Sequence, residues 1–134
     1  MQSINLYDII WNGKKVIILK INHYIDGKLI NKYENILNEE EKNSKKYKFF
    51  LDNISNYIYI TDRLVFIRES DDYIFKLDIT EKPTCSISLK SDNNELTVNV
   101  VSASYKENEK YIDIKYILET DDGEHHIIIE TDDN

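Results

Sequence analysis

Tyr111-Ile112-Asp113-Ile114-Lys115-Tyr116-Ile117-Leu118 is the stretch in which apolar and polar residues alternate most clearly. In an extended strand successive side chains point to opposite faces, so the even-numbered residues share one face and Asp113 and Lys115 lie on the other. A period of two is typical of a β-strand with one face in a core and the other in water. This stretch therefore predicts a half-buried strand.

The same alternation recurs along the chain between clusters of turn-forming residues. Asp26-Gly27 predicts a tight hairpin turn, because both positions favour φ > 0. We expect the polar stretch 38–46 to form an exposed loop, and residues 3–11 to form a short helix or an irregular strap. We expect strands over residues 14–24, 28–36, 46–51, 57–61, 64–69, 73–79, 85–89, 96–105, 111–118 and 125–130.

About eight to ten strands with short links, and no amphipathic helical segment between them, favour an all-β fold. A single antiparallel meander of this kind forms a sandwich or closes into a barrel, and closure removes the exposed edges. The length of 134 residues fits one domain, 1–134, with no internal repeat or linker.

The charge balance bears on partners and location. Lys and Arg number 17 against 25 Asp and Glu, a net charge of −8 that repels nucleic acid and anionic membrane surfaces. The lysines of 42–48 are largely cancelled by the glutamates of 39–41. Cys85 is the single cysteine, and no signal peptide or membrane-length apolar run is present. We expect a cytoplasmic protein with no nucleic-acid partner and no membrane contact.

The second half of the chain resembles a known family. The stretch Val65-Phe66-Ile67-Arg68-Glu69 and the pair of segments Ile112–Leu118 and His125–Glu130 resemble the small bacterial calycin-like barrels of the YwiB type. The first half is similar only through its opening strand and the Asp26-Gly27 hairpin, and it departs at residues 39–46 and 49–52. The resemblance implies a calycin or lipocalin-like antiparallel β-barrel in a cytoplasmic protein, and it brings no catalytic residues with it.

Histidines and acidic turns are the candidate metal ligands. His125 and His126 are adjacent on one strand and therefore point to opposite faces, and His23 shares a face with core residues. Asp121-Asp122-Gly123-Glu124 and Asp132-Asp133 offer oxygen ligands, but they lack the spacing of an EF-hand loop, and a hairpin turn needs such residues for its own geometry. We expect no metal site.

Catalytic signatures are absent from the sequence. Cys85 lies among core positions in Cys85-Ser86-Ile87-Ser88-Leu89, which favours a small apolar filler over a nucleophile. No nucleophile elbow, phosphate loop or dinucleotide motif occurs. We therefore expect a protein that is not an enzyme and that carries no cofactor.

Arg68 is the residue that most favours a ligand. If Leu64 and Phe66 face inward, Arg68 does too, and a buried guanidinium needs a carboxylate, carbonyls or an anionic ligand. Arg68, Tyr73, Phe75 and Tyr116 then predict a ligand-binding pocket for a small amphipathic molecule with an acidic head, in or at the mouth of the barrel.

Two structural alternatives remain open for Arg68. Val65 and Ile67 are also apolar, so the opposite register would place Arg68 outside. An inward Arg68 could also close the barrel end through a salt bridge with Glu34 or Glu119. Register and pairing are therefore left to the tertiary structure.

A protein-interaction module is the competing function. In that case the barrel is filled and the outer surface binds a protein or a second copy of the chain, giving a homodimer. Tyrosine is enriched at interfaces, and the chain has 10. The candidate tyrosines are Tyr7, Tyr24, Tyr33, Tyr47, Tyr57 and Tyr59.

Overall fold

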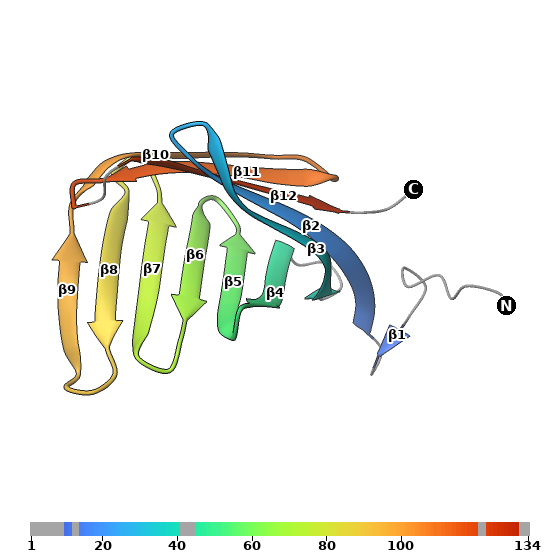
Figure 1. Cartoon of the computed structure of the whole chain (residues 1–134), viewed down its shortest axis with the longest axis horizontal. Coiled ribbons are helices and arrows are strands. Elements are labelled where there is room, and N and C mark those ends of the chain that lie inside the picture. The colour runs from blue at the N-terminus through green and yellow to red at the C-terminus, as the bar shows by residue number, and fades with distance from the viewer. Residues whose placement is uncertain (1–9, 12–13, 41–44, 121–122, 132–134) are drawn as a thin grey trace, which may run out of the picture.

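The computed structural model describes residues 10–11, 14–40, 45–120 and 123–131, which form two antiparallel six-stranded sheets (Figure 1). The first sheet contains β1 (Ile10–Trp11), β2 (Lys14–Ile25), β3 (Lys28–Glu40), β10 (Val100–Glu107), β11 (Tyr111–Leu118) and β12 (Glu124–Thr131). The second contains β4 (Lys45–Leu51), β5 (Ile54–Ile60), β6 (Leu64–Glu69), β7 (Tyr73–Ile79), β8 (Thr84–Leu89) and β9 (Asn94–Val98). Within the described ranges no helix is long and apolar enough to cross a membrane.

Two-residue turns set the register of two hairpins. Asp26 and Gly27 have φ values of 51° and 78°, so the predicted turn between β2 and β3 is confirmed. Asp52 and Asn53, with φ values of 51° and 65°, join β4 to β5 in the same way. Asn and Asp tolerate this left-handed region better than other non-glycine residues, which explains their positions.

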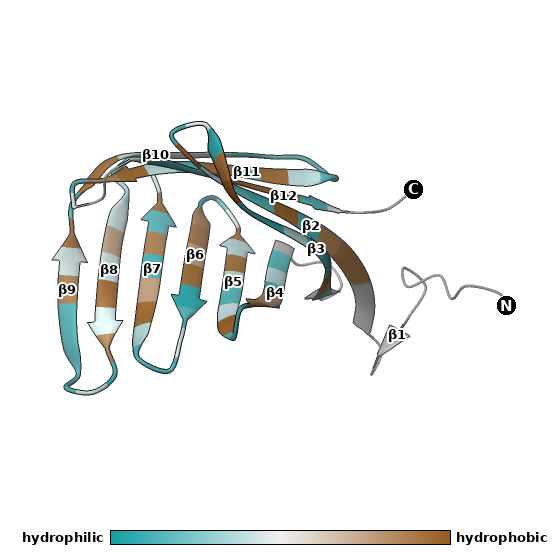
Figure 2. Cartoon of the chain, in the orientation of Figure 1, coloured by the Kyte–Doolittle hydropathy of each residue, from teal (hydrophilic) through white to brown (hydrophobic). Residues whose placement is uncertain are grey.

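The core lies between the facing sides of the two sheets. On β11 the predicted inner residues Ile112, Ile114, Tyr116 and Leu118 are all buried, so the predicted face is confirmed. Figure 2 shows the corresponding apolar bands along the strands of both sheets. The second sheet contributes Ile58, Leu64, Phe66, Leu77, Ile79 and Cys85 to the same core.

The chain passes from the second sheet to the first at Asn99. The single strand predicted over 96–105 was wrong, because β9 ends at Val98 and β10 begins at Val100 in the other sheet. The backbone carbonyl of Asn99 accepts a hydrogen bond from the N–H of Glu119 at 2.9 Å, and its side-chain amide donates to the Glu119 carboxylate at 2.7 Å. These bonds hold the corner against the end of β11.

The other seam lies between β3 and β4. The exposed loop predicted over 38–46 was wrong at its ends, since β3 continues to Glu40 and β4 starts at Lys45. Asn38 is fully buried. Its side-chain oxygen accepts the backbone N–H of Lys48 at 2.7 Å. This polar side chain therefore bonds β3 to β4. Residues 41–44 lie outside the described part of the chain.

The all-β antiparallel prediction is confirmed, while neither hydrogen-bonded ladder closes on itself in the described residues. Ile10–Trp11 forms a strand paired with β2, so the helix or strap predicted over 3–11 was wrong at this end. Residues 3–9 of that prediction lie outside the described residues, as do Asp121-Asp122 and Asp132-Asp133 of the acidic turns.

Candidate functional site

The register of β6 places Arg68 on the inner face. Leu64 and Phe66 are 0% and 3% exposed, and the period of two carries Arg68 to the same side. Arg68 lies directly opposite Phe75 on β7. The alternative register, with Val65 and Ile67 inside, does not occur.

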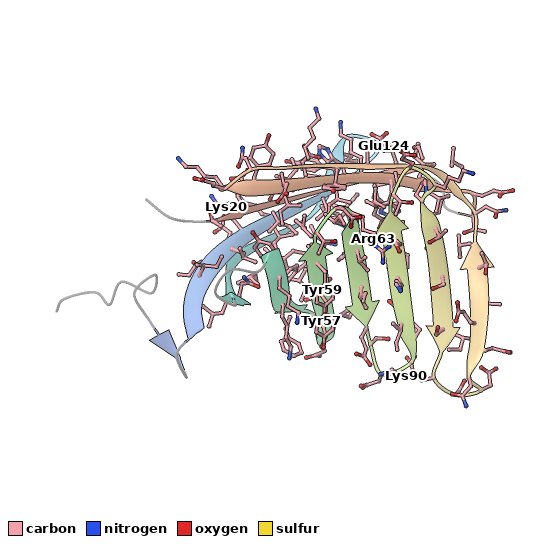
Figure 3. All side chains as sticks on the ribbon, turned by 180° about the vertical axis from the view of Figure 1, so that it is seen from behind. Lys20, Tyr57, Tyr59, Arg63, Lys90 and Glu124 are labelled. Carbon is pink, nitrogen blue, oxygen red and sulfur yellow. The ribbon has the colours of Figure 1, made fainter. Side chains whose placement is uncertain are left out.

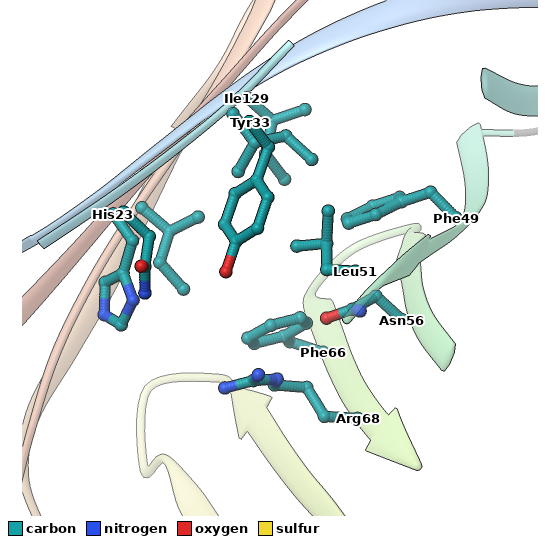
Figure 4. Close-up of a pocket in the computed structure, with 11 residues that line it drawn as sticks. His23, Tyr33, Phe49, Leu51, Asn56, Phe66, Arg68 and Ile129 are labelled. Atoms are coloured by element: carbon teal, nitrogen blue, oxygen red, sulfur yellow. The ribbon is translucent and has the colours of Figure 1, made fainter. Parts of the chain in front are cut away.

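Arg68 reaches a pocket of about 130 Å³ between the two sheets (Figure 4). One wall comes from β2, β3 and β12 of the first sheet, and the other from β4, β5 and β6 of the second. The lining is mostly aliphatic and aromatic, with a few polar groups, as is typical of small-molecule sites. It consists of Ile21, His23, Asn31, Tyr33, Phe49, Leu51, Asn56, Phe66, Arg68, Ile127 and Ile129.

Arg68 carries a charge that no described carboxylate neutralises. Its Nε atom is buried and has no hydrogen-bond partner among the described residues. The predicted salt bridge is not formed: Glu34 pairs with Lys32 at 3.2 Å, and Glu119 accepts its bond from Asn99. A buried donor without a partner costs about 1 to 3 kcal/mol, which makes this guanidinium a site that an acceptor would stabilise.

Tyr33 connects the pocket to its rim. Its hydroxyl donates to the carboxylate of Asp52 at 2.9 Å, and Asp52 is exposed at the β4–β5 turn. Burial raises the pKa of Tyr33, and the hydrogen bond and charge of Asp52 raise it further, while the charge of Arg68 acts in the opposite direction. Tyr33 therefore keeps its proton, directed to Asp52, at neutral pH.

Three of the four residues predicted to form the pocket, Arg68, Phe75 and Tyr116, are neighbours, but the four do not together line this pocket. Of these, Arg68 alone lines it. Phe75 is its cross-strand neighbour, and the Phe75 ring centroid lies 6.2 Å from that of Phe66 and 6.2 Å from that of Tyr116. Tyr116 is buried in the core, and Tyr73 is half-buried at the start of β7, opposite Leu89. A ligand-binding role for these residues stays a prediction.

Sequence reasoning missed the lining residues of β3 because the strand is irregular. The β2–β3 register shifts between Leu19 and Ile21, where Asn35 of β3 has a φ of 58°. Asn31 and Tyr33 line the pocket before this bulge, whereas the inward residues after it are even-numbered, as buried Asn38 shows. An inserted residue reverses the alternation on which strand prediction rests.

The histidines divide between the two faces of the first sheet, as their adjacency predicts. His23 Nε2 lies 2.9 Å from His125 Nδ1, and the His125 ring stacks on Tyr116 at 4.8 Å between centroids. On the opposite face, His126 Nε2 lies 2.7 Å from the carboxylate of Asp113. In the part of the chain that the structure describes, no three potential metal ligands come together.

Comparisons with known proteins give one structural likeness to report. No family model matches the chain, and no curated protein matches it. The chain is similar to the ywiB protein from Bacillus subtilis. The two have 12% sequence identity and a TM-score of 0.45, over 88% of this chain and 91% of that chain. No residue role is transferred at this level of likeness.

Proposed function

We propose that the protein is a non-catalytic binding module for a small amphipathic ligand held between the two sheets. The observation that carries the proposal is Arg68, whose buried Nε has no hydrogen-bond partner among the described residues and which lines a pocket with six apolar side chains. An apolar wall favours a hydrocarbon body, and an unpaired cation favours an acidic head. Both halves of an amphipathic molecule thus have a counterpart in the pocket.

We further propose that the two sheets act as one calycin-like barrel of the YwiB type, with the pocket at its mouth. Two contacts support this arrangement: the chain crosses between sheets at Asn99, and Asn38 bridges β3 to the edge of β4 at the other seam. In Figure 1 the strands of the first sheet cross over the ends of the second. Side-chain bonds at a seam can replace a backbone ladder where strands diverge.

A cytoplasmic location is part of the proposal. Cys85 is the single cysteine, and it is free and buried in the core. Burial raises the pKa of its thiol to about 11, which suppresses the reactive thiolate. A chain with one inert thiol and no disulfide suits a reducing compartment.

Native mass spectrometry of the protein purified without refolding tests the proposal. We expect a small molecule bound with a stoichiometry of about one per chain, released and identified after denaturation. The matched variant Arg68→Met preserves an unbranched apolar stem without the charge, and it should be recovered bare. A wild-type protein that carries nothing and binds no added small acid, or an Arg68→Met variant that retains the same molecule, would contradict the pocket proposal.

A protein-interaction module is the second candidate, and the outer face of β4 and β5 favours it. Tyr57 and Tyr59 stack with ring centroids 6.4 Å apart (Figure 3). Lys48 and Lys46 lie over these rings at 5.7 and 5.2 Å, and Phe50 is 61% exposed beside them. Exposed aromatic residues of this kind are enriched at protein interfaces, and the lysines add cation–π contacts to the tyrosine rings.

The other candidate tyrosines are placed differently. Tyr33 lines the pocket, Tyr47 packs against the core, and Tyr24 contacts the His126 ring. Tyr7 lies outside the described residues. Sedimentation of wild type and of Tyr57→Ser/Tyr59→Ser tests this candidate: a wild-type dimer that becomes monomeric in the variant supports it, and a wild-type monomer argues against self-association.

A further inference from the structure

We infer that the ligand is a compact monocarboxylate whose carboxylate binds Arg68 and whose apolar body is about the size of one benzene ring. This inference rests on the proposed function and names the chemical class that the pocket selects. Charge, hydrogen-bond geometry and size each restrict the class independently.

Charge limits the head group to one negative charge. Among the 11 lining residues Arg68 is the only Lys or Arg, and none is Asp or Glu. Acidic residues outnumber basic ones in the chain by 25 to 17, so a pocket wall without any acid is notable. Asp52 accepts the Tyr33 hydroxyl at the rim of the pocket, and its charge disfavours a second negative charge on the ligand.

A phosphate head is a poorer match than a carboxylate. A phosphate monoester carries about −1.5 to −2 charges at neutral pH, which a single guanidinium does not balance. The net charge of −8 adds to the repulsion of a dianion. A carboxylate brings one charge and is neutralised by Arg68 alone.

Hydrogen-bond geometry also favours a carboxylate. The guanidinium is a planar fork that donates two parallel bonds to the two oxygens of a carboxylate. The buried Nε of Arg68 is one prong of that fork and has no acceptor within the part of the chain that the structure describes. Two other donors of the lining already have acceptors within the protein, since Tyr33 donates to Asp52 and the Asn56 amide donates to the Ile54 carbonyl at 3.0 Å. Arg68 is therefore the group that receives the acid.

Size restricts the apolar body. The pocket of about 130 Å³ is slightly smaller than an engineered protein cavity of about 150 Å³ that accommodates benzene. Phe49, Leu51 and Phe66 of the second sheet lie across this space from Ile129 of the first (Figure 4), and Ile127 also lines it. A single ring or a short branched chain fills this space, whereas a long acyl chain would have to extend beyond it into solvent.

Titration of ¹⁵N-labelled full-length protein with four matched probes tests the inference. Benzoate is the reference, benzamide removes the charge, phenyl phosphate doubles it, and decanoate lengthens the body. We expect benzoate to shift the amide signals of Ile21, Phe66 and Ile129, and to bind at least about tenfold more tightly than each of the other three probes. In Arg68→Met we expect benzoate affinity to fall at least about tenfold, with Arg68→Lys between the two.

The opposite results overturn the inference. Equal binding of benzoate and benzamide, tighter binding of decanoate or phenyl phosphate, no benzoate binding at all, and unchanged benzoate binding in Arg68→Met each do so. The amide spectrum of Arg68→Met shows directly that the variant is folded. A co-purified ligand of another class, found by mass spectrometry, overturns this inference and leaves the proposed function standing. A protein that binds no probe and carries no ligand overturns both.

Discussion

The side chain of Asn38 in β3 accepts the backbone N–H of Lys48 in β4 at 2.7 Å, so a side chain joins the two sheets at a seam where the described residues form no backbone ladder. β4 pairs through its opposite edge with β5, and Lys48 lies opposite Tyr57 there. The N–H of Lys48 therefore points away from its own sheet and needs a partner. Asn38, which is fully buried, supplies it.

Replacing Asn38 should weaken the seam. In Asn38→Ala the partly buried N–H of Lys48 loses its acceptor, and we expect the free energy of unfolding to fall by about 1 to 3 kcal/mol in urea denaturation. Leu37→Ala is the matched control, because Leu37 is 57% exposed on the same strand and its loss should cost within about 0.5 kcal/mol. Equal losses in the two variants would show that the Asn38 bond does not stabilise the seam.

The two arginines should respond in opposite directions to loss of charge. Arg63 forms an ion pair with the largely buried carboxylate of Asp78 at 3.3 Å, so Arg63→Met should lower the free energy of unfolding by up to about 1 kcal/mol. Arg68 has no such partner among the described residues, so Arg68→Met should leave the ligand-free protein equally stable or more stable. Thermal unfolding of ligand-free protein measures both. A marked loss in Arg68→Met would indicate a structural role for Arg68.

Cys85 should make the protein lose stability in alkali. The pKa of its thiol is raised from 9.0 to about 11 by burial, so between these pH values the unfolded chain releases a proton that the folded chain keeps. The contribution of this thiol to the free energy of unfolding is constant below pH 9. It falls by about 2 to 3 kcal/mol as the pH rises to 11. Urea denaturation at pH 8, 9, 10 and 11 measures the fall.

Cys85→Ala isolates that contribution from other groups that titrate in alkali. Tyr33 also has a raised pKa and acts with the same sign above its ordinary value of 10.0, but it is present in both proteins. We therefore expect the difference in stability between wild type and Cys85→Ala to shrink by about 2 to 3 kcal/mol across this range. A pH-independent difference would refute the raised pKa.

Asp26 and Gly123 should be energetically coupled. Asp26 Oδ1 accepts the backbone N–H of Glu124 at 2.8 Å, and a Cβ added at Gly123 would lie 2.6 Å from Asp26 Oδ2. Gly123→Ala should therefore displace the carboxylate and cost about 1 to 2 kcal/mol by urea denaturation. In an Asp26→Ala background the same substitution should cost at least about 0.5 kcal/mol less. Additive effects would mean that the two positions do not interact.

Local pattern was sufficient for much of the fold. The alternation in 111–118 predicted the buried face of β11, and Asp26-Gly27 predicted the turn between β2 and β3. Both predictions succeed because strand faces and φ > 0 preferences depend on neighbouring residues only. The same logic predicted that His125 and His126 point to opposite faces. For the pocket, however, local pattern identified Arg68 and not the residues around it.

The sequence by itself thus determined the antiparallel strands, most of their inner faces and the presence of an arginine within reach of the core. Only the tertiary structure decided the register that turns Arg68 inward, the passage between sheets at Asn99 and the bulge at Asn35 that brings Tyr33 to the pocket. The physical reason is that a one-residue slip or bulge exchanges the two faces of a strand. Packing against a distant strand selects between these near-equal local alternatives.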